Sequence, residues 1–179
     1  MTDFTLHTLE SAPDASKPLL EDSARIYGMI PKLHAVLAES PEALEAYKQL
    51  HNHVLNSSLT AEEKTVVWQT INVEHGCHYC VPAHSMIANM MNVDSGIVQA
   101  LRDRTPLPTE KLEVLRDTTL AILKDRGVID GSALERFYAV GYGKQQLLEI
   151  LMTLSQKVIS NYINHIADTP LDEAFKPFA

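Results

Sequence analysis

A carboxylate, two cysteines and a histidine lie within one short stretch of this chain, Glu74–His84. Cys77 and Cys80 are its only two cysteines. Cysteines three positions apart on a helix lie on one face, within reach of a disulfide. A histidine four positions after Cys80 can place its imidazole against that sulfur. The spacing therefore predicts redox chemistry by a CxxC pair, with His84 assisting the thiol and Glu74 as a nearby carboxylate.

The cysteine pair is expected at the beginning of a helix. Gly76 predicts a break between two helices, and residues 85–91 are helical in pattern. Unpaired N–H groups and the helix dipole favour a thiolate on the first turn. Pro82 fits this position, because proline costs least near a helix start.

The pattern Glu-x-x-Cys-x-x-Cys-x-x-x-His resembles the carboxymuconolactone decarboxylase superfamily, and best its AhpD-like alkylhydroperoxidase branch. Four further stretches are similar to uncharacterised members: Ser11–Pro13, Gly28–Pro31, Leu37–Pro41 and Asn161–His165. The resemblance implies an all-α fold, reduction of a peroxide substrate, and a homo-oligomer, either a trimer or a hexamer. It also implies re-reduction by an external dithiol, from a thioredoxin-like or lipoyl protein, and no cofactor.

The chain departs from the family pattern at one position. The best-studied AhpD-type pattern has a glutamate twelve residues before the first cysteine, where this chain has Thr65. Either Glu74 takes its place in the proton relay, or the relay is absent.

We expect Cys80 to attack the peroxide and become a sulfenic acid, and Cys77 to condense with it to a disulfide. The reverse order stays open, because the first cysteine of such a pair is often the more exposed. Tyr79 is a candidate pocket residue between the cysteines. Asn161, Asn164 and His165 form one polar face of an otherwise apolar helix, and the resemblance makes this face a candidate pocket contact.

Other interpretations of the motif remain open. A lactone decarboxylase, like the namesake of the superfamily, would leave the CxxC unexplained. A non-enzymatic redox sensor would use the same two thiols, and free cysteines can also be plain core residues. Zinc would need Cys77, Cys80 and His84 with His75 or His78, but a whole site in so short a helical stretch strains tetrahedral geometry.

Composition excludes several classes. The chain has 179 residues and a net charge of −8, and no basic stripe indicates a nucleic-acid partner. No apolar run approaches the roughly 20 residues of a membrane span. No secretory signal is visible at the N-terminus. We therefore expect the cytoplasm, where a CxxC is more often catalytic or metal-binding than structural.

The elements that must position the motif are helices, because no stretch alternates at period two. We expect an all-α domain over residues 16–179, of about eight helices, preceded by an arm over residues 1–15. Thr60 and Glu63 form a capping box before a helix that leads into the motif. Met86, Met90 and Met91 are expected in the core or at a subunit contact. The expected helices cover about 16–28, 31–38, 41–55, 60–74, the motif helix, 95–102, 110–126, 132–140 and 144–167.

Overall fold

The computed structural model describes residues 4–179, and in this part of the chain every regular element is a helix. This confirms the predicted all-α fold, with nine α-helices rather than about eight. The α-helices are Lys17–Tyr27 (α1), Lys32–Leu37 (α2), Pro41–Leu55 (α3), Ala61–Glu74 (α4), Cys80–Met90 (α5), Ser95–Asp103 (α6), Glu110–Lys124 (α7), Gly131–Ala139 (α8) and Lys144–Ile166 (α9). Two 3-10 helices, Asp14–Ser16 (η1) and Glu173–Phe178 (η2), lie near the ends.

Local capping explains most of the predicted helix boundaries. The capping box of Thr60 and Glu63 is present at the start of α4, and Gly28 ends α1 in the left-handed conformation at φ 71°. The sequence pattern also predicts Ser16 as the N-cap of α1 and Ser132 as the N-cap of α8, and both predictions were wrong. The Ser16 hydroxyl donates to the Ala38 carbonyl instead of capping α1. Asp130, and not Ser132, caps α8, because its carboxylate accepts the Ser132 N–H.

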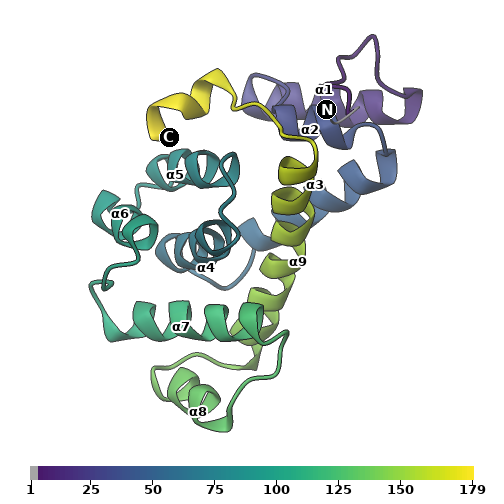
Figure 1. The fold of residues 1–179 in the computed structure, drawn as a ribbon. Helices are drawn as coiled ribbons and strands as arrows, with labels where there is room; N and C mark the ends of the chain where they lie inside the picture. Colours follow the sequence, from purple (N-terminus) through teal and green to yellow (C-terminus); the bar gives the residue numbers. More distant parts are fainter. Residues whose placement is uncertain (1–3) are drawn as a thin grey trace.

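Helix α4 lies at the centre of the arrangement, with α5, α6, α7 and α9 packed around it (Figure 1). Helix α9 runs along one side of the molecule and also contacts α2 and α3. The C-terminal η2 lies across α5. The C-terminal segment therefore reaches the helix that begins with the cysteines, and α9 packs with that helix against α4.

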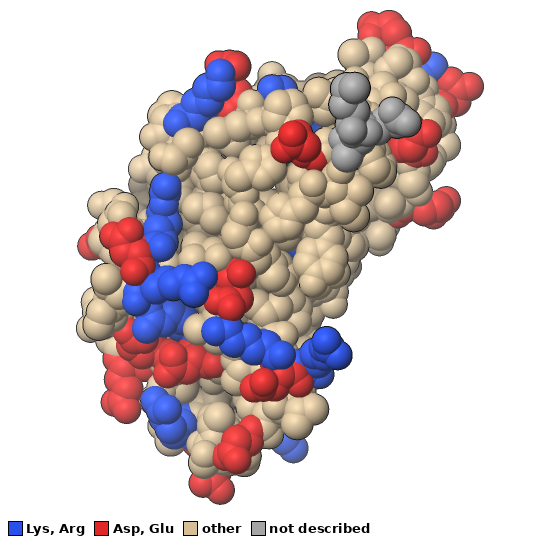
Figure 2. Space-filling view, viewed as in Figure 1, with Lys and Arg blue, Asp and Glu red and all other residues tan. Residues whose placement is uncertain are grey.

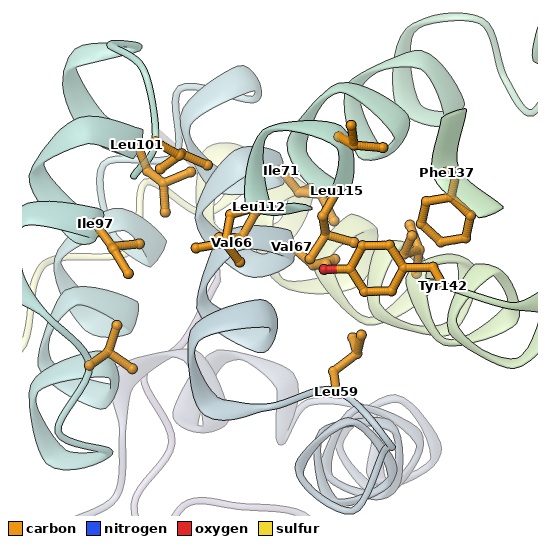
Figure 3. Packing of buried hydrophobic residues seen from close by; sticks show 14 of the residues in the cluster. Leu59, Val66, Val67, Ile71, Ile97, Leu101, Leu112, Leu115, Phe137 and Tyr142 are labelled. Carbon is orange, nitrogen blue, oxygen red and sulfur yellow. The ribbon is translucent and has the colours of Figure 1, made fainter. Parts of the chain in front are cut away.

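Two hydrophobic clusters fill the interior. The apolar cluster lies between α4, α6, α7, α8 and α9, and most of it is visible in Figure 3. The thiol cluster lies between α1, α2, α3, the beginning of α5 and η2. Its buried members are Ala12, Leu20, Leu33, Leu37, Ala38, Leu44, Tyr47, Cys77, Tyr79, Cys80, Ala83 and Phe175. The two cysteines thus lie in the second hydrophobic core.

The predicted N-terminal arm is described from residue 4 onward, and residues 1–3 of it lie outside the described part. The His7 N–H donates to the Ala35 carbonyl, and its Nε2 lies 2.7 Å from the Glu39 carboxylate. Ala12 is buried in the thiol cluster. The arm therefore packs against the domain. Within residues 4–179, no helix is both long enough and apolar enough to cross a membrane.

Candidate active site

The cysteine pair lies where the chain turns from α4 into α5. Gly76 takes the left-handed conformation at φ 63°, which confirms the predicted break, and Cys80 is the first residue of α5. The Cys80 N–H donates to the Cys77 sulfur over 3.2 Å. Both cysteines are free thiols and buried, with 0% and 2% of their surface exposed. The pair is thus held together at a helix N-terminus and shielded from water.

A lysine from α9 is the cationic partner of this pair. Lys157 is fully buried, and its Nζ lies 2.8 Å from His84 Nε2. Its charge also acts on the sulfurs of Cys80 and Cys77. Among its contacts in the described chain there is no carboxylate. We did not anticipate Lys157 from the sequence, although it lies four and seven positions before Asn161 and Asn164 and so on the same helix face.

Side-chain amides hold the first turn of α5 from two sides. Asn164 donates from Nδ2 to the Cys80 sulfur over 3.3 Å, and Asn72 of α4 donates to the Cys80 carbonyl. Asn161 donates to the Asn72 side chain, and its own carbonyl oxygen lies 2.8 Å from His75 Nδ1. Of the predicted polar face of α9, Asn161 and Asn164 are therefore buried beside the cysteine pair.

These contacts divide the charge unequally between the sulfurs. Burial raises the pKa of Cys80, but hydrogen bonds from Cys77, Asn164 and Asn161 and the charge of Lys157 outweigh it and lower that pKa to about 5. The hydrogen bond to Cys80 and burial raise the pKa of Cys77 far above its ordinary range. At neutral pH the arrangement favours a thiolate on Cys80 and a thiol on Cys77.

His84 differs from its expected role as a charged neighbour of the thiol. The ring is buried between Trp68, with ring centroids 4.8 Å apart, and Lys157. Burial and the Lys157 charge hold the pKa of His84 well below its usual range, so the imidazole is neutral. The structure therefore places a lysine amine, and not an imidazolium, beside Cys80. Burial lowers the pKa of this amine below its ordinary value, although the charges of Cys80 and Cys77 oppose the shift.

Glu74 and Thr65 do not meet the cysteines. The Glu74 carboxylate lies 3.4 Å from Arg104 and 3.3 Å from Lys124, and its described contacts include neither sulfur nor His84. Glu74 ends α4, and the left-handed turn at Gly76 directs the following chain inward while Glu74 stays beside α6 and α7. The Thr65 hydroxyl donates to the Ala61 carbonyl within α4.

Tyr79 and His165, two further predicted site residues, contact groups other than the two sulfurs. The Tyr79 hydroxyl donates to the Asp172 carboxylate, and its ring packs edge-on against Phe175 at 5.5 Å between centroids. Tyr79 thus ties the motif to the C-terminal segment. The exposed His165 stacks on His78, with ring centroids 6.5 Å apart, and neither ring approaches the sulfurs in the contacts described.

The histidines proposed as zinc ligands are engaged elsewhere. His84 faces Lys157, His75 faces Asn161, and His78 Nε2 lies 2.9 Å from the Thr169 carbonyl oxygen. Across residues 4–179, no three His, Cys, Asp or Glu side chains come close enough together to bind one metal ion.

Comparison with known proteins shows likeness in structure. Neither a family profile nor a curated protein matches the sequence. A peroxidase-related protein with an alkylhydroperoxidase AhpD core from Ralstonia eutropha matches with a TM-score of 0.85 at 17% identity, over 97% of this chain and 94% of its own. A peroxidase-related protein from Silicibacter matches with a TM-score of 0.80 at 18% identity, over 97% of this chain and 94% of its own.

A third similar structure belongs to an enzyme with a different reaction. It is a cysteine-to-alanine variant of the debrominase Bmp8 in complex with 2,3,4-tribromopyrrole, with a TM-score of 0.82 at 17% identity, over 99% of this chain and 96% of its own. At such identities the likeness concerns the fold. It confirms that the chain has the AhpD-like helical fold.

Proposed function

We propose that this protein is a thiol-dependent hydroperoxide reductase in which Cys80 attacks and Cys77 resolves. One observation carries the proposal: the buried Cys80 sulfur receives the Asn164 amide and the Lys157 charge, while Cys77 remains protonated beside it. A thiolate is the reactive form of cysteine, and a neighbouring thiol is what converts a sulfenic acid to a disulfide.

The proposed reaction has three steps. The Cys80 thiolate attacks the terminal peroxide oxygen, the O–O bond breaks, and an alcohol leaves once its oxygen has gained a proton. Cys77 then attacks the Cys80 sulfenic acid, which releases water and forms the Cys77–Cys80 disulfide. An external dithiol, from a thioredoxin-like or lipoyl protein, reduces the disulfide by exchange. We place this cycle in the cytoplasm, where reductants return such pairs to thiols.

The surroundings of the sulfurs favour an apolar substrate. Leu33, Leu37 and Phe175 belong to the same cluster as the cysteines. An alkyl hydroperoxide would bury its hydrocarbon part there, whereas hydrogen peroxide would gain nothing from the apolar wall. We therefore propose that organic hydroperoxides are the better substrates.

A second reaction deserves a parallel assay because of the likeness to the debrominase. Reductive removal of bromine from a brominated pyrrole also takes two electrons, which a dithiol pair can supply. Tribromopyrrole should therefore be tested beside the hydroperoxides as a substrate.

Thiol titration tests the proposed function directly. Reduced protein should lose two thiols for each equivalent of hydroperoxide, with both cysteines in one linked peptide and a mass lower by two hydrogens. Turnover should follow when a dithiol is added. Thiols that stay free after peroxide would overturn the proposal and leave the decarboxylase interpretation. A disulfide that forms without turnover would instead indicate a redox sensor.

We also propose a homo-oligomer, a trimer or a hexamer. Figure 2 shows a largely uncharged surface over α5 and the C-terminal half of α9. On these helices Met90, Tyr162 and Ile166 are at least half exposed, and a contact between subunits would cover them. Sedimentation at micromolar concentration should give more than one chain per particle, and a monomer would contradict the proposal. Tyr162→Glu should lower the particle mass if this surface is the contact.

A further inference from the structure

Among residues 4–179, the described contacts of the buried Lys157 amine include no carboxylate counterion. The titratable groups that face it are His84 from α5, His51 from α3, and the two cysteines. The α4 residues at this end of the site are uncharged: Trp68, Gln69 and Asn72. Burying an ammonium without an anion costs free energy. Removal of one partner of a buried ion pair is strongly destabilising, because it leaves the other charge uncompensated. The Cys80 thiolate is the one anion that the site can offer to Lys157.

That anion exists in only one redox state. A Cys77–Cys80 disulfide carries no charge, so oxidation of the pair removes the counterion of Lys157. The amine would then be enclosed with a neutral imidazole and an apolar wall. An amine in such surroundings is stable in its neutral form.

We propose that Lys157 is the proton donor of the reaction and that its protonation follows the redox state of the cysteines: ammonium beside the dithiol, neutral amine beside the disulfide. The proposal rests on the proposed function for its substrate, and on the placement of Lys157, His84 and Cys80 for its chemistry.

The proton balance closes under this assignment. Cys80 begins as thiolate, Cys77 as thiol and Lys157 as ammonium. Attack on the hydroperoxide oxidises the Cys80 sulfur by two electrons, and the departing alkoxide takes a proton from Lys157. Cys77 attacks the sulfenic sulfur, and its proton leaves with the hydroxide as water. The external dithiol then supplies two electrons and two protons, which restore the thiolate, the thiol and the ammonium.

His84 serves as the positioning residue for this amine. Its Nε2 lies 2.8 Å from Nζ, and its ring is fixed against Trp68. A neutral imidazole nitrogen accepts a hydrogen bond from the ammonium, and either tautomer can pair with the neutral amine. His84 Nδ1 has no partner within the described chain, so a change of tautomer breaks no other hydrogen bond. The pair can therefore accommodate both protonation states without moving.

Nitrogen NMR of protein labelled with ¹⁵N at the lysine Nζ tests the inference without any peroxide. The Lys157 signal, assigned by its loss in Lys157→Met, should have the ammonium shift in reduced protein at pH 7. After the disulfide is formed with a diazene dicarboxamide oxidant, it should move to the amine shift and return on reduction. An ammonium shift in both states would overturn the inference, and so would an amine shift in both.

Alkylation of Cys80 provides the second measurement. In Lys157→Met the pKa of Cys80 should rise from about 5 toward the ordinary thiol value, and alkylation at pH 7 should slow by up to about 30-fold. Lys48→Met is the matched control, because Lys48 is also largely buried but pairs with Asp22 at 2.9 Å. It should leave the alkylation profile unchanged. Should Lys157→Met fail to fold, Lys157→Gln and the NMR experiment decide the question.

The outcomes separate this inference from the proposed function. A Lys157 signal that follows the redox state in a protein that turns over no hydroperoxide would support the redox-linked protonation of Lys157 and reject both the peroxidase and the role of Lys157 as its proton donor. Normal turnover with a Lys157 signal that never changes would do the reverse.

Discussion

The two hydrophobic clusters of this molecule differ in the polar groups that surround them. The apolar cluster consists of aliphatic and aromatic side chains (Figure 3). At its edge the Tyr142 hydroxyl donates to Glu63, which also pairs with Lys111. The thiol cluster is bordered by buried polar groups, among them His34, His51, His84 and Lys157. Each of these groups costs free energy to bury unless it is paired.

The difference indicates which cluster supplies stability and which supplies chemistry. Burial of hydrocarbon is favourable by about 25 cal/mol per Å², so the apolar cluster stabilises the fold with no charge to neutralise. In the thiol cluster, the cost of burying titratable groups offsets part of this favourable free energy. The pKa values of these groups lie far from their ordinary ones. Groups shifted in this way are typical of functional sites.

Substitution of the cysteines should have the largest effect and should leave the apolar cluster untouched. Cys80→Ser should abolish hydroperoxide reduction, because the attacking sulfur is gone. Cys77→Ser should keep the first step and accumulate a sulfenic acid at Cys80, trapped by a dimedone-type reagent. If the label appears on Cys77 in an active Cys80→Ser variant, the two roles must be exchanged.

Mild acid should destabilise the molecule through the thiol cluster. Burial, as the main cause, lowers the pKa of His34 to about 3 and of His51 to about 4, and holds that of His84 well below its usual range. Below pH 6.5 the imidazoles of the unfolded chain bind protons that those of the folded chain do not. The free energy of unfolding therefore decreases as the pH is lowered, until the pH reaches the pKa values of the folded chain. At pH 5.5 the loss is about 1.4 kcal/mol for each of His34 and His51, roughly 3 kcal/mol together, and His84 acts in the same direction.

The thiolate acts in the same direction. The pKa of Cys80 is lower in the folded than in the unfolded chain, so its contribution is full above the unfolded value near 8.5 and is lost as pH falls toward 5. Urea unfolding of reduced protein at pH 7.5 and 5.5 measures the sum. Equal free energies of unfolding at the two pH values would show that the imidazoles are not buried in neutral form.

A cavity in the apolar cluster should lower the free energy of unfolding by an amount that does not depend on pH. Leu115 is fully buried there, and Leu115→Ala should lower the free energy of unfolding by about 2–5 kcal/mol. The loss should be the same at pH 7.5 and 5.5, because no titratable group of the thiol cluster is touched. Folded Leu115→Ala should react with hydroperoxide at the wild-type rate, and a slower reaction would mean that the two clusters are coupled.

The smallest effect is expected at Glu74. Its carboxylate is shared between Arg104 and Lys124 at a partly exposed position, where an ion pair contributes about 0–1 kcal/mol. Glu74→Gln should change neither the hydroperoxide rate nor the alkylation profile of Cys80. A clear fall in the hydroperoxide rate of Glu74→Gln would restore the proton relay that the motif suggested.

Several features follow from the sequence because they depend on near neighbours. The Thr60–Glu63 capping box, the left-handed turns at Gly28 and Gly76, and the cysteine pair at the beginning of α5 each involve contacts over a few positions. The all-α fold follows from the helical period of the apolar residues. Asn161 and Asn164 could be flagged because polar residues on an apolar helix face are conspicuous.

The charge of the site was decided only by tertiary packing. Lys157 and His84 are 73 positions apart, and they meet because α9 and α5 both pack against the central α4. In sequence, Glu74 is the nearest carboxylate before the cysteines, yet one left-handed glycine leaves it beside Arg104. Spacing along a chain fixes which side chains share a helix face, whereas the electrostatic environment of a buried sulfur depends on every helix packed around it.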